Sequence, residues 1–321
     1  MNWRFPAAAA CVALVLSACT SAPAPDATPA AGNEPAAATT PAGKGIAPTN
    51  ASSDWMSKLP QKYKDSGVLK IATVDGSAPW AFFDQAANTA KGVNADLLNE
   101  AAKRLGLTVE WSAIQFQAAL PAVQAGRFDI FAADMADRTD RQEVVNFIDY
   151  STEGSGVVVP KGNPKGIKSF ADICGLKAMF QSGSLFSDLT TELNNTTCKD
   201  NPIKPIEAAD KTATYVACAS GQVDVTFDTY GVSNYNFTTA DAGVNLQLEL
   251  APIKPFAPAV QGMAFSQDEP DLLYAVAGAM QKMKEDGTYQ AIFDKWAVGP
   301  LALKQITVNT ILEAGLTDFL P

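Results

Sequence analysis

From Val68 onward, short runs of β-forming residues alternate with helix-forming segments, and this alternation limits the folds open to the chain. Apolar residues recur at helical spacing in the longer segments and run or alternate through the shorter ones. This order is typical of α/β layers and not of an all-β sandwich. The first cycle predicts a strand over 68–74, a helix over 94–105 that Asn94 can cap, a strand over 107–111, a helix over 118–125 and a buried strand over 128–133.

A second α/β unit begins after the extended stretch 156–160. Residues 55–321 are enough for two lobes with separate cores. For 301–321 the sequence specifies no packing. The second unit predicts a strand over 177–180, a helix over 212–221 and a strand over 223–228, and two helices follow over 270–286 and 288–296.

The N-terminus is typical of a secretory signal peptide. Residues 1–18 begin with Arg4, continue through an apolar run too short to span a bilayer and end in small residues. The tetrapeptide Leu16-Ser17-Ala18-Cys19 resembles the bacterial lipobox, in which Cys19 becomes the lipid-modified first residue. The alternative is an ordinary cleavage site beside a chance cysteine.

The segment that follows is of low complexity. Of the 35 residues in 20–54, 28 are Ala, Pro, Ser, Thr or Gly and none is aromatic. Such a composition cannot bury a core, so residues 19–54 are predicted to be a lipid anchor and a flexible tether. The expected location is extracytoplasmic, lipid-anchored to the bacterial cell membrane, in the periplasm or on the outer face.

Composition excludes several functional classes. The chain has no histidine, which removes the Ser/His/Asp triad, the Cys/His dyad and the HExxH zinc site. The formal charge of -10 would repel a nucleic acid, which is therefore not an expected partner. No P-loop and no GxGxxG motif occur, and no cofactor is expected.

Three cysteines remain if Cys11 leaves with the signal peptide and Cys19 carries a lipid. In an oxidising compartment, a disulfide between Cys174 and Cys198 is the preferred pairing, because Cys218 lies in an apolar helical pattern that suggests a buried thiol. The alternative is a metal site, which three cysteines without histidine or CxxC spacing do not favour.

One candidate anion-binding residue is Arg141. Thr139 and Gln142 match a capping box, which would place Arg141 in the first turn of a helix beside free backbone N–H groups. A guanidinium there can bind a carboxylate in bidentate fashion. The alternative is a surface arginine paired with Asp140 or Glu143.

Further candidates lie where predicted strands end. Trp80, Asp134 and Asp228 fall at the carboxyl ends of strands, which is where open α/β sheets bind ligands. Asp228 could instead cap the next turn. Gly183 and Ser184 belong to a Gly/Ser turn that could present N–H groups to an anion, with Ser184 as a helix cap, although a plain turn is the alternative.

The order of the motifs resembles the bacterial extracellular solute-binding proteins of family 3, the receptors of polar amino-acid ABC importers. The match covers roughly residues 67–298 and rests on seven weak motifs in the right order. They are Ala78-Pro79-Trp80, Gly92-Val93-Asn94-Ala95-Asp96-Leu97, Leu120 through Asp129, Asp140 through Phe147, Gln181-Ser182-Gly183-Ser184, Asp286-Gly287-Thr288-Tyr289 and Lys295-Trp296.

The resemblance implies two α/β lobes joined by two extended hinge strands that close on a ligand, the type II periplasmic-binding-protein or Venus-flytrap fold. Lobe 1 would comprise 55–155 plus 256–321, and lobe 2 would comprise 156–255. The implied ligand is a polar amino acid, delivered by a monomeric receptor to an ABC transporter permease without catalysis. Trp80 would form an aromatic wall, Arg141 would clamp the α-carboxylate, Gly183 and Ser184 would add donors, and Asp228 would take the α-ammonium.

Departures from the family pattern concern the ligand's side chain. Ala136 stands where the family often has Ser or Thr, and Asp134 stands where it often has Gly. Asp134, Asp137 and Asp75 near the cleft would suit a cationic side chain, and the alternative for Asp137 is a turn cap.

Two other functional classes stay open on sequence grounds. A periplasmic cyclohexadienyl or arogenate dehydratase resembles the same fold, with Asp134 as the candidate protonated acid. A sensor domain that signals to another membrane protein is the third class, for which nothing in the chain argues separately.

Overall fold

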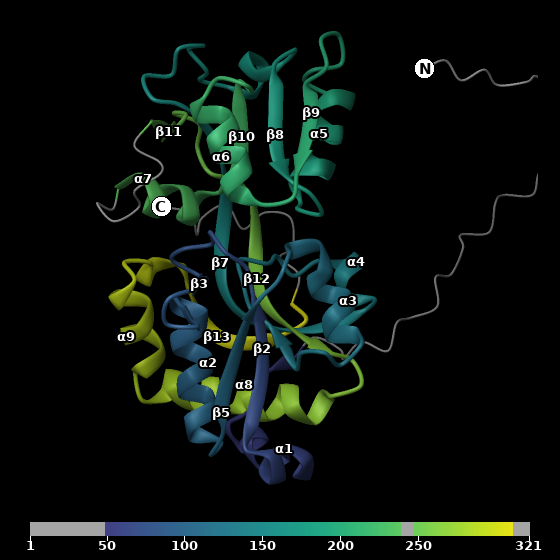
Figure 1. Cartoon of the computed structure of the whole chain (residues 1–321), viewed down its shortest axis with the longest axis vertical. Coiled ribbons are helices and arrows are strands. Elements are labelled where there is room, and N and C mark those ends of the chain that lie inside the picture. The colour runs from purple at the N-terminus through teal and green to yellow at the C-terminus, as the bar shows by residue number, and fades with distance from the viewer. Residues whose placement is uncertain (1–48, 239–246, 311–321) are drawn as a thin grey trace, which may run out of the picture. The chain divides into compact units, whose positions relative to one another are not determined.

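A computed structural model describes residues 49–238 and 247–310, and these form an α/β body around one mixed sheet of eleven strands. Two long antiparallel strands at its centre, β7 (Val145–Pro160) and β12 (Phe256–Ser266), connect the two halves of the body (Figure 1). The strand order along the main path is β5-β2-β6-β12-β7-β10-β8-β9. The predicted N-terminal signal peptide, the lipidation site Cys19 and most of the tether lie outside the described residues.

The first half is built on three parallel strands, β2 (Val68–Thr73), β5 (Thr108–Ala113) and β6 (Ile130–Phe131). One face of these strands carries the largest hydrophobic cluster, and the other face packs on α3 (Figure 1). The helices are α1 (Gln61–Ser66), α2 (Val93–Arg104), α3 (Ala119–Gln124), α4 (Thr139–Gln142), α8 (Pro270–Glu285) and α9 (Thr288–Lys295). Short elements are η1 (Ser53–Lys58), η2 (Phe116–Ala118), η4 (Gly299–Leu301) and the hairpin β3 (Phe82–Asp84) and β4 (Thr89–Lys91).

The second half repeats this arrangement on a smaller scale. Its parallel strands are β8 (Lys177–Gln181), β9 (Lys204–Ala208) and β10 (Val225–Thr229). The helix α5 (Phe186–Asn195) packs on one face and α6 (Lys211–Ala219) on the other, each over its own hydrophobic cluster. The remaining elements are η3 (Phe170–Ile173), α7 (Tyr230–Thr238) and β11 (Leu248–Leu250).

The strand β7 belongs to both halves. It pairs with β12 from Val145 to Ser155, and from Ser155 to Val158 it also pairs with β10. Every residue of β7 except the last is buried. Its buried residues include the polar side chains of Asn146, Asp149 and Glu153, so the burial of this strand does not follow from an apolar run in the sequence.

The N-terminal end of the described region departs from the sequence prediction, and the C-terminal end forms a strand where the sequence specified no packing. The predicted tether extended to Asp54, whereas Thr49–Asn50 forms β1 and pairs with β13 (Ala302–Val308). β13 in turn pairs with β7. These two segments, far apart in the sequence, satisfy each other's backbone N–H and C=O groups by pairing as strands. The amino-acid composition of either segment does not indicate this, because backbone hydrogen bonding depends little on residue type.

The helix caps were also predicted incorrectly. Asn94 lies inside α2 and donates from its side-chain Nδ2 to the Ala133 carbonyl, 3.0 Å away. Thr139 is the first helical residue of α4 and makes no capping box, and α5 begins two residues after Ser184. In each case a tertiary contact or the turn geometry decides where the polar side chain points.

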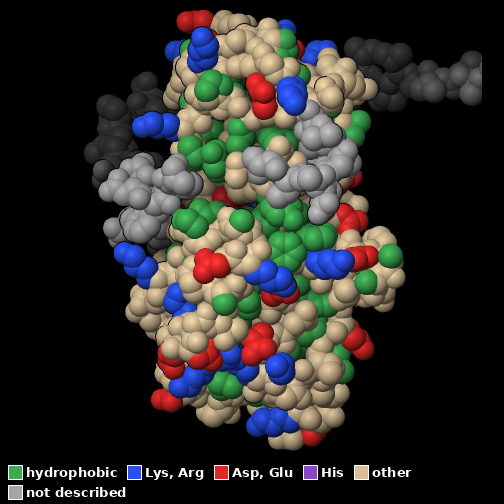
Figure 2. Space-filling view, turned by 90° about the vertical axis from the view of Figure 1, so that its left-hand side faces the viewer, with side chains coloured by type: hydrophobic (Ala, Val, Ile, Leu, Met, Phe, Trp, Pro, Cys, Tyr) green, Lys and Arg blue, Asp and Glu red, His purple; other side chains and the backbone are tan. Residues whose placement is uncertain are grey.

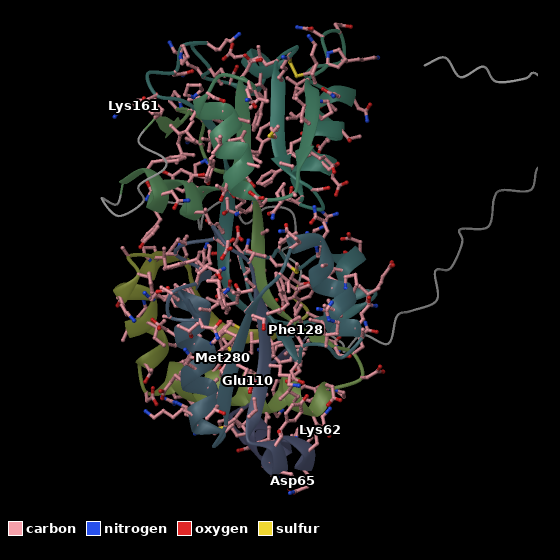
Figure 3. All side chains as sticks on the ribbon, in the orientation of Figure 1. Lys62, Asp65, Glu110, Phe128, Lys161 and Met280 are labelled. Carbon is pink, nitrogen blue, oxygen red and sulfur yellow. A yellow bond between two sulfur atoms is a disulfide. The ribbon has the colours of Figure 1, made fainter. Side chains whose placement is uncertain are left out.

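Cys174 and Cys198, the pair preferred on sequence grounds, are joined by a disulfide, which lies in the second half near the end remote from the first (Figure 3). Cys198 is buried in the same cluster as Phe180 and Phe227. Cys218 is free and buried in α6, and burial raises the pKa of its thiol to about 12. The thiol of Cys218 is therefore protonated and packs as a small apolar side chain.

We expect the paired substitution Cys174→Ser and Cys198→Ser to lower the free energy of unfolding by about 3 kcal/mol, because the disulfide closes a loop with a sequence separation of 24. Urea denaturation of the oxidised parent and the variant measures the difference. Reductant should lower the stability of the parent alone. An equal response of the variant to reductant would contradict a stabilising role for this bond.

Candidate functional site

A small, partly open cavity lies where the two halves meet. Its volume is about 30 Å³, enough for about two water molecules. A wider groove of about 600 Å³, which contains Asp75 and Val216, adjoins it through Phe116 and Gln181. The cavity is lined by Phe116, Asp134, Ala136, Arg141 and Gln261 from the first half or the connecting strands, and by Gln181, Ser184, Leu185, Phe186, Lys211, Thr214, Phe227, Asp228 and Thr229 from the second.

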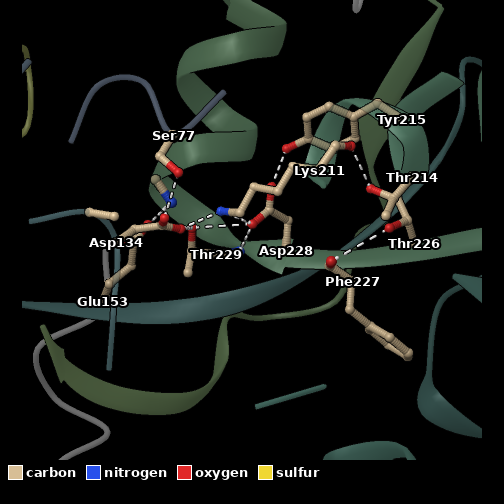
Figure 4. Close-up of polar contacts among 12 residues, drawn as sticks. Ser77, Asp134, Glu153, Lys211, Thr214, Tyr215, Thr226, Phe227, Asp228 and Thr229 are labelled. Atoms are coloured by element: carbon tan, nitrogen blue, oxygen red, sulfur yellow. Dashed lines mark hydrogen bonds and ion pairs between the residues drawn. The ribbon is translucent and has the colours of Figure 1, made fainter. Parts of the chain in front are cut away.

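Two predicted site residues, Asp134 and Asp228, meet in this cavity around a third charged group. The Lys211 ammonium forms an ion pair with Asp134 and another with Asp228 at 2.6 Å (Figure 4). The side chains of both aspartates are 2% exposed and that of Lys211 is 9% exposed. Burial and the two carboxylates act in opposite senses on Lys211, and the carboxylates prevail and raise its pKa. Lys211 is therefore charged.

Hydroxyl groups complete the shell around the two carboxylates. The Ser77 hydroxyl donates to Asp134 at 2.7 Å, and the Thr229 hydroxyl donates to the same carboxylate at 3.2 Å. The Tyr215 hydroxyl donates to Asp228, and the Thr229 backbone N–H donates to its other oxygen at 2.7 Å. Burial raises the pKa of Asp228 above its ordinary value, and the nearby Lys211 charge opposes that rise.

Sequence reasoning missed Lys211. It is the first residue of α6, placed there because Asp210 caps the helix and accepts a hydrogen bond from the Ala213 N–H at 2.8 Å. A lysine in the first turn of a helix is ordinarily solvated. The one local signal was the capping aspartate, and it indicates where the helix starts, not where the lysine points.

Arg141 lies in the same cavity as the two aspartates. Its Nη1 donates to the Ala136 carbonyl at 2.7 Å and its Nη2 donates to the Gly183 carbonyl at 3.1 Å. Its guanidinium carbon stands 5.6 Å from the centre of the Phe116 ring. Burial, followed by the nearby Arg138, lowers the pKa of Arg141 to about 10, so it remains charged at neutral pH. The two hydrogen bonds use only part of its donor fork.

Two side-chain atoms in the cavity wall have no hydrogen-bond partner among the described residues. They are the Ser184 hydroxyl and the Gln261 Oε1, and both are buried. An unpartnered buried polar atom costs about 1–3 kcal/mol. Gly183, the residue before Ser184, accepts a hydrogen bond from Arg141 at its backbone carbonyl. It therefore contributes an acceptor to the site. The cavity therefore holds polar groups that a small polar ligand would satisfy.

Trp80 does not line the cavity. Its side chain is fully buried in the hydrophobic core of the first half, with its ring 6.0 Å from Tyr150 and 6.1 Å from Phe293. The backbone N–H of Asn94 donates to the Trp80 carbonyl, which fixes this loop on the start of α2. The aromatic side chains in the cavity wall are Phe116, Phe186 and Phe227.

The other acidic residues expected near the cleft are separated from Asp134. Asp137 accepts two hydrogen bonds from the Gln142 side chain and does not line the cavity. Burial raises the pKa of Asp137 to about 6. Asp75 lines the wider groove. Among the residues that the structure describes, Asp134 and Asp228 alone therefore bring carboxylates into the cavity wall.

A buried acid in β7 lies close behind the cluster (Figure 4). Glu153 is 1% exposed, accepts a hydrogen bond from the Gly231 N–H, and has its Oε2 atom without a partner among the described residues. Burial, followed by the negative charge of Asp134, raises the pKa of Glu153 to about 8. At neutral pH this carboxyl group is mainly protonated and neutral.

Within residues 49–238 and 247–310, no group of three or more His, Cys, Asp or Glu side chains is arranged so that it could hold a metal ion. In the same residues no helix is long and apolar enough to cross a membrane. On the face shown in Figure 2, acidic and basic side chains are interspersed and form no continuous basic patch.

Two α/β halves, joined by two long strands and meeting around a charged cavity, define the two-lobe fold of periplasmic amino-acid-binding proteins. The chain belongs to the bacterial extracellular solute-binding proteins of family 3, whose family model matches residues 69–299. The fold class that the sequence predicted is thus confirmed.

Individual relatives fall in the same class. The chain is 29% identical to the L-cystine-binding protein TcyA of Bacillus subtilis (strain 168) over 235 residues, which cover 73% of this chain and 82% of that protein. An ancestral arginine-binding protein, solved with arginine bound, matches with a TM-score of 0.64 and 28% identity over 72% of this chain and 98% of its own. An ancestral amino acid-binding protein, a precursor of cyclohexadienyl dehydratase, matches with a TM-score of 0.63 and 26% identity over 74% and 98%.

We expect the protein to lose stability as the pH rises from 4.5 to about 8, because Glu153 stays protonated in the folded state and ionises when the chain unfolds. The stability gained by keeping Glu153 protonated in the folded state is complete below pH 4.5 and is lost above about pH 8. Between these values its slope approaches about 1.4 kcal/mol per pH unit. Chemical denaturation across this range should give a shallower decline for Glu153→Gln than for the parent. Parallel curves would refute the assignment.

Proposed function

We propose that the protein is an extracytoplasmic receptor that binds a polar amino acid in the cavity between its lobes and delivers it to an ABC transporter permease. The observation that carries the proposal is the gathering of opposite charges in one cavity wall, with Arg141 and Asp134 from the first half and Asp228 from the second. A zwitterion taken out of water needs both of its charges matched. The relatives named for cystine and arginine binding support the same ligand class.

The roles within the site follow from the donors and charges present. Arg141 holds the α-carboxylate with the N–H groups that its bonds to Ala136 and Gly183 leave available. Ser184 donates its unpartnered hydroxyl to the same carboxylate. Asp228, with Asp134 beside it, takes the α-ammonium. Trp80 supports the loop of Ser77 from the core and does not form a wall over the ligand.

Closure of the lobes around the ligand is the signal that a permease would read. Contacts between the halves in this closed arrangement include the ion pairs Lys211–Asp134 and Arg138–Asp188, the latter at 2.6 Å. The cavity is too small for an amino acid as it stands, so the halves must separate for entry. The long strands β7 and β12 act as the hinge, and the ligand drives closure through its greater affinity for the closed state.

We assign lobe 1 to residues 55–155 plus 256–321, with β1 added at its edge by pairing with β13, and lobe 2 to 156–255. Residues 1–18 act as signal peptide, and Cys19 carries the lipid that anchors the chain to the cell membrane. The receptor works as a monomer, since both charges of the ligand are met by one chain.

The site favours binding over catalysis. A dehydratase needs a cleft acid that can donate a proton, and Asp134, the candidate for that role, is held in an ion pair with Lys211. Glu153 carries a proton at neutral pH but does not line the cavity. Asp228, the other carboxyl group in the described part of the cavity wall, is likewise held in an ion pair with Lys211, so neither is set up as a general acid.

We expect Arg141→Ala to weaken amino-acid binding about 100-fold, because it leaves the ligand carboxylate buried without its counter-charge. Thermal-shift titration of the purified chain against the twenty amino acids, ornithine, citrulline and prephenate identifies the ligand, and isothermal calorimetry then gives the affinities. Arg127→Ala, which removes an arginine outside the cavity lining, is the matched control. Unchanged affinity in Arg141→Ala would overturn the site, and turnover of prephenate would favour the enzyme.

Cys19→Ala should release the protein from the membrane fraction into the soluble fraction, because the lipid on Cys19 is the proposed anchor. Fractionation of expressing bacteria, followed by immunoblotting, measures the distribution. Cys11→Ala, within the predicted signal peptide, serves as the control and should leave the protein with the membrane. Retention of Cys19→Ala in the membrane fraction would count against lipidation.

A further inference from the structure

The charged groups that line the cavity are two carboxylates and two cations. They are Asp134, Asp228, Lys211 and Arg141, and together they are electrically neutral. Glu153, immediately behind them, adds no charge at neutral pH because it is protonated. A ligand with a net charge would therefore leave that charge uncompensated in a buried site, which is costly.

The cations are unequally placed. Arg141 contacts carbonyl oxygens of Ala136 and Gly183, so its charge is free to meet a carboxylate. Lys211 is already committed, because its ammonium contacts Asp134 and Asp228 together. The group of two aspartates and one lysine thus keeps a single net negative charge, enough to balance one ammonium group.

Lys211 is fixed in this position from several directions. Its residue is held at the start of α6 by the Asp210 cap, and the Thr214 hydroxyl donates to its carbonyl at 2.8 Å. Its ammonium is nearly excluded from solvent and bridges a carboxylate of the first half to one of the second. Removing a charge from two buried partners is strongly unfavourable, so Lys211 stays with at least one aspartate when a ligand enters.

We propose that Lys211 is a specificity-determining residue, which stands in for the basic side chain of a ligand and restricts the cavity to amino acids with uncharged side chains. This inference rests on the proposed amino-acid-binding function and narrows it. With Lys211 present, an amino acid such as glutamine has its carboxylate met by Arg141 and its ammonium by the remaining negative charge. Arginine or lysine would bring a second cation, for which the described part of the cavity wall holds no further carboxylate; Asp75 lines the adjoining groove instead.

Without Lys211, the same cavity would carry two uncompensated carboxylates opposite one arginine. That pattern matches a ligand with one carboxylate and two cationic groups, which is a basic amino acid. The expectation from sequence of a cationic ligand counted Asp134 but not the lysine that neutralises it. One side chain thus reverses the preferred charge of the ligand.

The test compares glutamine with arginine in calorimetric titrations of the purified full chain, with the other uncharged amino acids, lysine and ornithine as further ligands. The parent should bind its best uncharged amino acid at least tenfold more tightly than any basic one. Lys211→Met should reverse that order, shifting the ratio of affinities about 100-fold toward the basic ligand. Lys282→Met, which removes an exposed lysine paired with Glu285, should leave the ratio unchanged.

A second variant guards against misfolding, because Lys211→Met leaves two buried carboxylates facing each other. Combining Lys211→Met with Asp134→Asn restores the single net negative charge and should return the preference to uncharged amino acids. Thermal melting without ligand verifies that each variant is folded. A double variant that binds basic amino acids preferentially would overturn the charge-count explanation.

The outcomes separate this inference from the proposed function. A parent that binds arginine or lysine as tightly as any uncharged amino acid overturns the role of Lys211 and leaves the receptor function standing. A folded parent that binds no amino acid overturns both. Lys211→Met that keeps the preference of the parent while folded also overturns the role of Lys211.

Discussion

Three charged side chains are buried where the two halves meet, and the surrounding structure has to provide each of them with a partner. Asp134 follows a strand of the first half, Lys211 begins a helix of the second, and Asp228 ends a strand of the second. Each alone would be costly to bury, and together they are tolerable because each has a partner and hydroxyl groups complete the shell. The position of both halves in the closed arrangement is therefore linked to this one cluster.

The cluster also explains how a receptor of this kind can be both rigid and mobile. Separate hydrophobic clusters hold each half together, while β7 and β12 carry the chain between them. Movement about these strands would break the Lys211–Asp134 and Arg138–Asp188 contacts but leave Lys211 and Asp228 together, since both belong to the second half. If the halves separate as proposed, Asp134 loses Lys211 and stays on the half that carries Arg141, and ligand binding and closure would be one equilibrium.

Several residues of the candidate site, as well as the fold class, could be predicted from the sequence. Asp134, Arg141, Ser184 and Asp228 were identified from strand ends, from a helix start and from a resemblance in motif order, and all four line one cavity. Trp80 was expected to face the ligand but lies in the core of the first half. An aromatic residue after a turn gives no indication of which way its ring will point. For Lys211 the sequence offered only the capping Asp210, which marks the start of the helix but not the burial of the lysine, since a lysine there is normally solvated.

Sequence by itself determined the α/β alternation, the family and the elements on which the site residues lie, because these depend on local periodicity and on motif order along the chain. Only the tertiary structure decided that Thr49–Asn50 and Ala302–Val308 pair, that Asn94, Thr139 and Ser184 are not helix caps, and that Lys211 neutralises the acidic side of the cavity. These features depend on which distant groups are brought within a few ångströms of one another. The charge that a cavity presents is a sum over such groups, and no local pattern contains that sum.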